Sequence, residues 1–309
     1  MRKEAKTRRP IIITGQQDYH NGHFNCEEYA TEGFEDGFKV FTSDRTAPAD
    51  GTAKTYGPEI ELESNIDNPT VLAAVLEKIV FPIFPKGLFK HQYDGSLGGN
   101  TSTEVICQPM TKAFIRNHYN DFKTMWTFLK SLGTVPGASC GMHVNIGLPC
   151  FGTTREKQEA AIVRLHNYIS NNYRAACVLF KRDPDNTYYC SRRAAVRTFA
   201  DLSFSNDHHA MTNYSHIEAG AAARVEIRLI GPQKSFAAFR NTFEVVFHLV
   251  DAARNGRDFT DPVRLWSGCN ECVLDRLEDL YCAGGLTLPQ YEAIKARSKN
   301  SGIQEATRG

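Results

Sequence analysis

The sequence has no long hydrophobic run and almost no excess of charge of either sign. No window of its 309 residues approaches the roughly eighteen consecutive apolar residues of a membrane span, so no membrane association is predicted. The 36 Lys and Arg residues against 35 Asp and Glu give a net charge of +1, which disfavours a nucleic-acid partner held by bulk basic charge. The basic start Met1–Lys6 lacks the apolar segment of a secretory signal.

A disulfide framework and the common phosphate-binding loops are also missing. Nine cysteines form an odd, scattered set that is typical of reduced thiols, and we therefore predict a soluble cytoplasmic protein. Neither a GxxxxGK[ST] loop nor a GxGxxG fingerprint occurs, so a nucleotide would have to be held by metal ions and arginine. The 41% hydrophobic content is that of an ordinary globular protein.

The order of apolar patterns predicts an α+β fold, with one open sheet and helices packed on one of its faces. Helices are expected at about 69–80, 117–132, 153–180, 235–254 and 288–296. Three regions are expected: an N-terminal extension of unknown role over 1–55, a main domain over 56–262 and a C-terminal appendage over 263–309. Short strands are expected within the extension at 11–14 and 38–41.

The most informative segment is Tyr56–Glu63, where acidic and aliphatic residues alternate. Alternate residues of a strand share a face, so Glu59, Glu61 and Glu63 are expected to lie together, opposite Ile60. Three carboxylates on one face repel each other unless that face is solvated or carries cations.

Three further segments repeat this layout of one aliphatic and one ionisable face. The run 224–229 places Arg224, Glu226 and Arg228 on one side, and the run 142–146 places His143 beside Asn145. In the run 103–107, Glu104 is the single charged residue. Taken together, the four strands predict a sheet with one dry face and one face lined by carboxylates, a histidine and two arginines.

Two interpretations of the ionisable face remain open. Polar residues that simply face water are the usual arrangement in an antiparallel sheet. Glutamate is, however, depleted in strands, and carboxylates with one histidine and no lysine form a ligand set suited to Mg²⁺ or Mn²⁺. The second interpretation requires the four strands to converge, which spacing alone does not prove.

Taken in order, four motifs resemble those of the amidoligase family of glutamine synthetase-like carboxylate–amine ligases, relatives of γ-glutamylcysteine ligase. The motifs are Gly57-Pro58-Glu59-Ile60-Glu61, Asp94-Gly95-Ser96-Leu97 with Glu104, Ser139-Cys140-Gly141-Met142-His143-Val144-Asn145, and Arg224-Val225-Glu226-Ile227-Arg228. The resemblance covers about residues 56–255. It implies a curved antiparallel sheet of the glutamine synthetase type with helices on its convex face.

The resemblance also implies roles for individual residues and a cofactor set of ATP with two or more Mg²⁺ ions, for which Mn²⁺ is a possible substitute. The metal ligands would be Glu59, Glu61, Glu104, His143 and Glu226. Arg228 would contact the transferred phosphoryl group; Arg224, Asn145 and Ser139 would help to hold the nucleotide; Asp94 and Ser96 would lie near the substrates. Asn145 stands where many members carry a second histidine. The plainer interpretation of Arg228 is a surface arginine paired with Glu226.

The activity implied by the resemblance is ATP- and Mg²⁺-dependent formation of an amide or peptide bond between a carboxylate and an amine. The substrates could be small molecules, peptides or proteins, and the oligomeric state is open. A phosphotransferase on the same fold and a non-catalytic metal- or nucleotide-binding module are the alternatives. Cys269 and Cys272 form a lone CxxC, for which free thiols are favoured over zinc binding.

Overall fold

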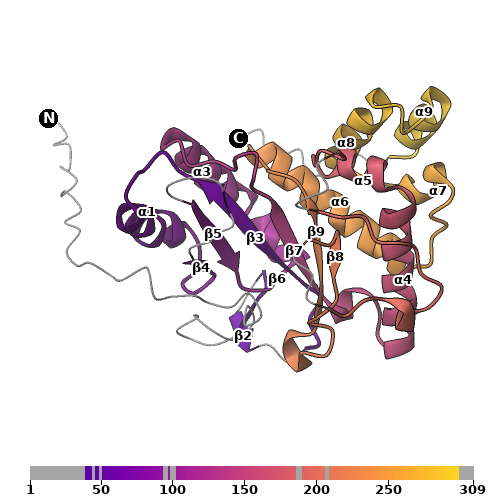
Figure 1. Cartoon of the computed structure of the whole chain (residues 1–309), viewed down its shortest axis with the longest axis horizontal. Helices are drawn as coiled ribbons and strands as arrows, with labels where there is room; N and C mark the ends of the chain where they lie inside the picture. Colours follow the sequence, from indigo (N-terminus) through magenta and orange to yellow (C-terminus); the bar gives the residue numbers. More distant parts are fainter. Residues whose placement is uncertain are drawn as a thin grey trace, which may run out of the picture.

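The computed structural model describes residues 39–43, 46–48, 51–92, 97, 102–185, 190–205 and 209–298. It is a mixed α+β structure with one open sheet (Figure 1). The strands are β1 (Lys39–Phe41), β2 (Thr46–Pro48), β3 (Thr55–Glu63), β4 (Phe89–Gln92), β5 (Ser102–Cys107), β6 (Met110–Thr111), β7 (Met142–Gly147), β8 (Thr212–Asn213) and β9 (Arg224–Ile230). The α-helices are α1 (Pro69–Val75), α2 (Lys112–Asn117), α3 (Tyr119–Ser131), α4 (Arg155–Asn171), α5 (Tyr173–Leu179), α6 (Phe236–Arg254), α7 (Pro262–Trp266), α8 (Glu271–Cys282) and α9 (Leu288–Ala296).

The four strands expected from alternation are β3, β5, β7 and β9, and they are neighbours in the sheet. The strand order is β2-β1-β6-β3-β7-β9-β8, with β5 also paired to β3 and β4 paired to β5. Every pair is antiparallel except β1 and β6, which run parallel through Phe41 and Met110. The expectation of an antiparallel sheet is therefore wrong at this short pair. Strands β2 to β5 lie between β1 and β6 in the chain, so no hairpin joins the two strands and none requires them to run in opposite directions.

One face of the sheet is apolar and is covered by helices, as the alternation predicts. Ile60 and Leu62 of β3 are fully buried, and Tyr56 packs edge-to-face against Phe247 of α6, with ring centroids 4.6 Å apart. This contact places α6 against the aliphatic face, next to β3 and β7 (Figure 1). The burial of these side chains removes apolar surface from water and leaves the carboxylates on the opposite face.

The predicted helices form, but one of them is broken. The predicted helix 117–132 is α3; α2 precedes it across His118 and was not predicted from the sequence. The predicted helix 153–180 breaks at Asn172 between α4 and α5, where Asn172 leaves the helical region of φ and ψ while apolar residues continue on either side, so the apolar spacing did not show the break. The segment expected at 69–80 is α1 followed by a π-helical turn, Leu76–Val80.

One cluster of buried apolar side chains extends from Phe41 in β1 to Ile294 in α9. Helices α7 and α8, which the sequence did not predict, contribute Trp266 and Leu277 to it. The expected strand 11–14 lies outside the described residues, and the three-region division stays a prediction. In the described parts of the chain, each helix is too short or too polar to cross a lipid bilayer.

Candidate metal centre

Register places the ionisable residues of the four strands side by side. Glu59 of β3 is paired with His143 of β7, and Glu61 is paired with Glu104 of β5. Asn145 of β7 is paired with Glu226 of β9. Paired side chains on one face lie about 4.5–5.5 Å apart at Cβ, so this register alone gathers the predicted ligands into one group. The convergence that the sequence left open is therefore present.

The imidazole of His143 is the centre of the group. Its Nδ1 lies 3.2 Å from Glu59 Oε2 and 3.3 Å from Glu226 Oε1, while its Nε2 lies 3.5 Å from Glu61 Oε1. Ligand atoms of Glu59, Glu104 and His143 all lie within 4.8 Å of one another, which is close enough for one cation to touch all three. A buried Glu-Glu-His group is thus present that could hold a metal ion.

The carboxylates are buried, so the simple interpretation of a polar face in water does not apply to them. Glu59, Glu61, Glu104 and Glu226 are between 3% and 8% exposed. Buried charges of one sign repel strongly in a medium of low dielectric constant and need compensation by cations or hydrogen bonds. Oxygen-rich acidic groups with one imidazole suit a hard divalent cation.

Arg228 supplies the positive charge in direct contact with this group. Its Nη1 donates to Glu226 Oε1 at 2.5 Å, and its side chain is 13% exposed. The guanidinium is thus paired with Glu226, as the plainer interpretation expects, but it is not a surface residue. Burial alone would lower the pKa of Arg228, but Glu226, Glu59, Glu61 and Glu104 raise it.

Glu59 is ionised in this environment despite its burial. Burial would raise the pKa of its carboxyl group, but the hydrogen bond and charge of His143, then Arg228 and Asn145, lower that pKa to about 2. A carboxylate that stays charged at neutral pH is the form that binds a metal ion.

Strand β9 has a bulge at Arg228 and Leu229, opposite His143 of β7. The β7–β9 register shifts between Met142 and Val144, so that Met142 is paired with Ile230 and Val144 with Ile227. The backbone N–H groups of Arg228 and Leu229 both donate to the Met211 carbonyl, at 3.0 and 3.2 Å. Regular alternation already places Arg228 on the acidic face with Glu226, and the extra residue after it returns Ile230 to the apolar face.

The glycine-bearing segment 136–141 lies at one end of the acidic row, the name we use for Glu59, Glu61 and Glu63 on one face of β3. The Ser139 hydroxyl donates to Glu63 Oε1 at 2.5 Å, and the backbone N–H of Gly141 donates to Glu61 Oε2. A side chain at position 137 would collide with the Glu63 carboxylate, so the close approach of this segment depends on glycine. Ser139 therefore lies beside Glu63, at the far end of the row from Asn145.

Arg182 is a further buried cation at this end. It is 7% exposed, and its Nη2 donates to the Ile230 carbonyl at 2.7 Å beside Gly141. Among the described residues, no hydrogen-bond partner faces Arg182 Nε.

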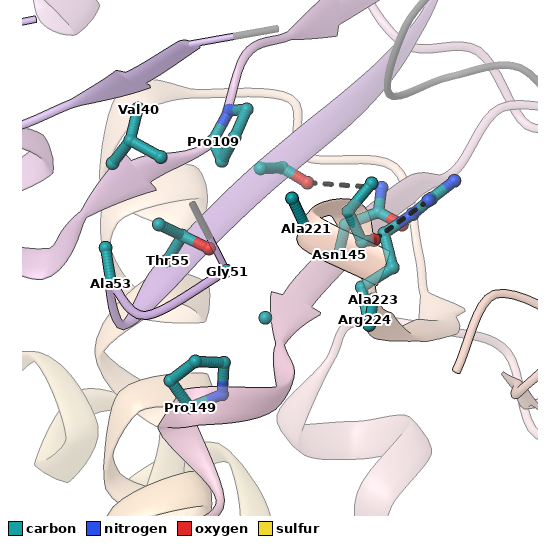
Figure 2. A pocket seen from close by; sticks show the side chains of 13 residues that line it. Val40, Gly51, Ala53, Thr55, Pro109, Asn145, Pro149, Ala221, Ala223 and Arg224 are labelled. Atoms are coloured by element: carbon teal, nitrogen blue, oxygen red, sulfur yellow. Dashed lines mark hydrogen bonds between the residues drawn. The ribbon is translucent and has the colours of Figure 1, made fainter. Parts of the chain in front are cut away.

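Asn145 and Arg224 lie at the opposite end and border a pocket. Arg224 Nε donates to Asn145 Oδ1 at 2.8 Å, and Asn145 Nδ2 donates to Glu59 Oε1 at 2.7 Å. The pocket has a volume of about 460 Å³, part of it open to solvent, and is lined mainly by Gly, Ala and Pro together with Thr55. Figure 2 shows Asn145 and Arg224 side by side on one wall of this pocket, across from Val40 and Thr55.

The structure thus brings together six residues singled out from the sequence and places three others around them. The six are Glu59, Glu61, Glu104, His143, Glu226 and Arg228; the three are Ser139, Asn145 and Arg224. Asp94 and Ser96 lie outside the described residues. Sequence reasoning missed Gln92, which donates to Glu104, because its short edge strand β4 has no alternating pattern.

The remaining chemical motif does not form a second centre. Cys269 and Cys272 are buried free thiols, and Asn270 between them caps helix α8. Within the described ranges, the group of Glu59, Glu104 and His143 is the one arrangement of three or more potential metal ligands.

Comparison with known protein families gives no match to this chain. Comparison with curated proteins gives none either. The functional assignment consequently depends on the geometry of the site and on the motif resemblance.

Proposed function

We propose that this chain is an ATP- and Mg²⁺-dependent carboxylate–amine ligase of the amidoligase type, with a glutamine synthetase-like sheet. The observation that supports the proposal best is the set of four buried carboxylates around the His143 imidazole with the Arg228 guanidinium inside it. Such a group combines cation ligands with a fixed positive donor, which are the two elements that phosphoryl transfer needs.

The chemistry explains why both elements are needed. A carboxylate resists attack by an amine, since its negative charge is delocalised over two oxygens. Transfer of the γ-phosphoryl group of ATP to that carboxylate gives an acyl phosphate and ADP; the amine then displaces phosphate and leaves an amide. Magnesium ions supply charge compensation for the phosphate oxygens and hold donor and acceptor in line.

The residues of this chain would divide these tasks by position. Glu59, Glu61, Glu104, Glu226 and His143 would hold the cations. Arg228, with its planar guanidinium fixed by Glu226, would bind the transferring phosphoryl group. Arg224, Asn145 and Ser139 lie at the two ends of the acidic row, where they would contact the nucleotide or the second substrate.

The test is ATP consumption with Mg²⁺ against pooled carboxylates and amines, with ADP, AMP and phosphate followed by chromatography. We expect ADP and phosphate to form only when both a carboxylate and an amine are present, and we expect Glu226→Ala to abolish turnover. Glu218→Ala is the matched control, because it removes an exposed carboxylate paired with Arg155. Full turnover in Glu226→Ala would contradict the assigned site.

Two alternatives give different readouts in the same experiment. A phosphotransferase would form ADP and a phosphorylated acceptor without releasing phosphate. A non-catalytic module would bind ATP and Mg²⁺, seen as a higher melting temperature of the wild type, with no turnover in any pool.

A further inference from the structure

Each of the four carboxylates around His143 accepts a hydrogen bond from a neutral N–H group. Asn145 Nδ2 donates to Glu59 Oε1 at 2.7 Å, Gln92 Nε2 donates to Glu104 Oε2 at 2.9 Å, and Asn213 Nδ2 donates to Glu226 Oε2 at 3.1 Å. The fourth, Glu61, receives the backbone N–H of Gly141 on Oε2. Three of the four donors are therefore side-chain amides, and all three of these residues are more than nine-tenths buried.

The surroundings fix which end of each amide faces its carboxylate. The Asn145 oxygen accepts from Arg224 Nε at 2.8 Å, and the Asn213 oxygen accepts from the backbone N–H of Ser215 at 2.9 Å. In both residues the NH₂ group must then point to the glutamate. An ionised Glu104 only accepts hydrogen bonds, so Gln92 must likewise present its NH₂ group.

The amides hold the oxygens that point away from the histidine. Glu59 is held on Oε1, while its Oε2 lies 3.2 Å from His143 Nδ1. Glu226 is held on Oε2, while its Oε1 lies 3.3 Å from the same nitrogen and also accepts from Arg228 Nη1 at 2.5 Å. Glu61 repeats the arrangement, with Oε1 lying 3.5 Å from His143 Nε2. In these three residues, one carboxylate oxygen is anchored outside and the other faces the centre.

Neutral donors have an effect that charged donors would not have. A lysine or arginine on the outer oxygens would cancel the negative charge that attracts a cation. A carboxamide fixes the orientation of the carboxylate and leaves its charge in place. Groups that orient metal ligands in this way commonly change metal affinity about 10- to 100-fold when they are removed.

We propose that Gln92, Asn145 and Asn213 are positioning residues that fix the orientation of Glu104, Glu59 and Glu226 in the group that would hold a hard divalent cation. This rests on the metal site of the proposed function and deepens it. The amides themselves bind no metal; they act through the glutamates to which they donate.

The test is a titration with Mn²⁺ alone, followed by electron paramagnetic resonance, on purified full-length protein. We expect Asn213→Leu and Gln92→Leu each to weaken Mn²⁺ affinity about 10- to 100-fold. The matched control is Asn241→Leu, which removes a buried side-chain amide that donates to Asp275 at 3.0 Å on helix α8. The control should lower the melting temperature and leave Mn²⁺ affinity within about twofold of wild type.

A double-mutant cycle separates positioning from a general loss of structure. If Asn213 acts through Glu226, Asn213→Leu should weaken affinity by less than about twofold in a Glu226→Gln background and by its full factor in a Glu104→Gln background. Gln92→Leu should show the reverse pattern, which gives a second variant on another strand if Asn213→Leu does not fold.

The outcomes distinguish this inference from the proposed function. Failure of the wild type to bind Mn²⁺ would overturn the metal site, and both proposals with it. Tight binding by wild type and by both leucine variants would overturn the positioning role and leave the metal site intact. Additive effects in both backgrounds would show that the amides act through general stability, and this too would contradict the inference.

Discussion

At the scale of single residues, Glu59 shows how a carboxylate stays charged inside the protein. It meets His143 through one carboxylate oxygen and Asn145 through the other. Its pKa of about 2 shows that these partners outweigh the cost of burial. A glutamate in a strand, fully charged and nearly inaccessible, is uncommon unless a ligand uses its charge.

Arg228 gives the first residue-scale prediction. We expect Arg228→Lys to retain ATP binding and to lower turnover about 100-fold, the scale of losing one fixed donor at a reacting group. Lysine keeps the charge but lacks the planar fork that binds Glu226 and a phosphoryl group together. Binding and steady-state turnover are measured on the same preparation. Arg254→Lys, at a helical ion pair with Asp251, is the control. Wild-type turnover in Arg228→Lys would remove Arg228 from the chemistry.

Residue types were predictable from the sequence to a large extent, but their partners were not. The alternation around Glu59 and Glu226 identified the face, since the strand period fixes which residues share it. Nothing in the sequence places Gln92 opposite Glu104 or Asn213 opposite Glu226, because strand register is decided by packing and turns. The pairing of these two amides with their glutamates could therefore be identified only from the structure.

At the scale of elements, a buried carboxylate on α6 ties four helices together. Glu244 is 1% exposed and accepts from Arg116 Nε at 2.8 Å, from the Tyr119 hydroxyl at 2.8 Å and from Asn270 Nδ2 at 2.7 Å. These donors come from α2, α3 and the N-cap of α8. Asn270 also accepts from the Val273 backbone N–H, so the start of α8 is fixed by the same contact.

We expect Glu244→Gln to lower the free energy of unfolding by about 1–3 kcal/mol at neutral pH, since an amide cannot accept all of these bonds. Burial alone would raise the pKa of Glu244, but Arg116, Tyr119 and Asn270 lower it below 4.5. A folded-state pKa below the unfolded value gives stability that is present above the unfolded pKa and lost as pH falls through the folded pKa.

The difference between wild type and Glu244→Gln should therefore be constant above about pH 5 and shrink on further acidification. Urea denaturation at a series of pH values measures it. Glu278→Gln removes the same charge from an exposed position on α8 and is expected to show no such difference. A Glu244→Gln difference that does not change with pH would contradict the assigned contacts.

Element prediction succeeded where the hydrophobic period was long and missed several short elements together with the twelve-residue helix α8. The stripe along α6, capped by Ser235, was identified from sequence because nineteen residues keep one helical period. Helix α7 spans only five residues and β4 only four, too few to show a period. Their positions depend on contacts with the rest of the molecule, such as the burial of Trp266 in the common core.

At the scale of the whole molecule, metal binding should stabilise the fold, because its ligands come from β3, β5 and β7. At a Mn²⁺ concentration 100 times the dissociation constant, we expect about 2.7 kcal/mol of stabilisation. For a chain of 309 residues this corresponds to a rise in melting temperature of roughly 4 °C. Calorimetry with and without a chelator measures the rise.

The variant His143→Gln should lose most of this rise, because it removes the ligand at the centre of the group. Substitution of His248 by Gln is the control, since that histidine lies on α6, is half-buried and stacks on Trp266 of α7, away from the acidic group. An equal rise in wild type and His143→Gln would place the cation elsewhere.

The strand pairing of the site also has a consequence for how the protein is made. Glu59 and His143 are separated by 84 residues, and Glu226 arrives on a later strand still. During synthesis, Glu59 and Glu61 leave the ribosome long before His143 and Arg228, which compensate their charge. The edge of β3 that pairs with β7 therefore stays unpaired until β7 has been made. A fragment that ends before β9 would therefore keep Glu59, Glu104 and His143 but lack the Arg228 guanidinium that offsets the charge of the carboxylates.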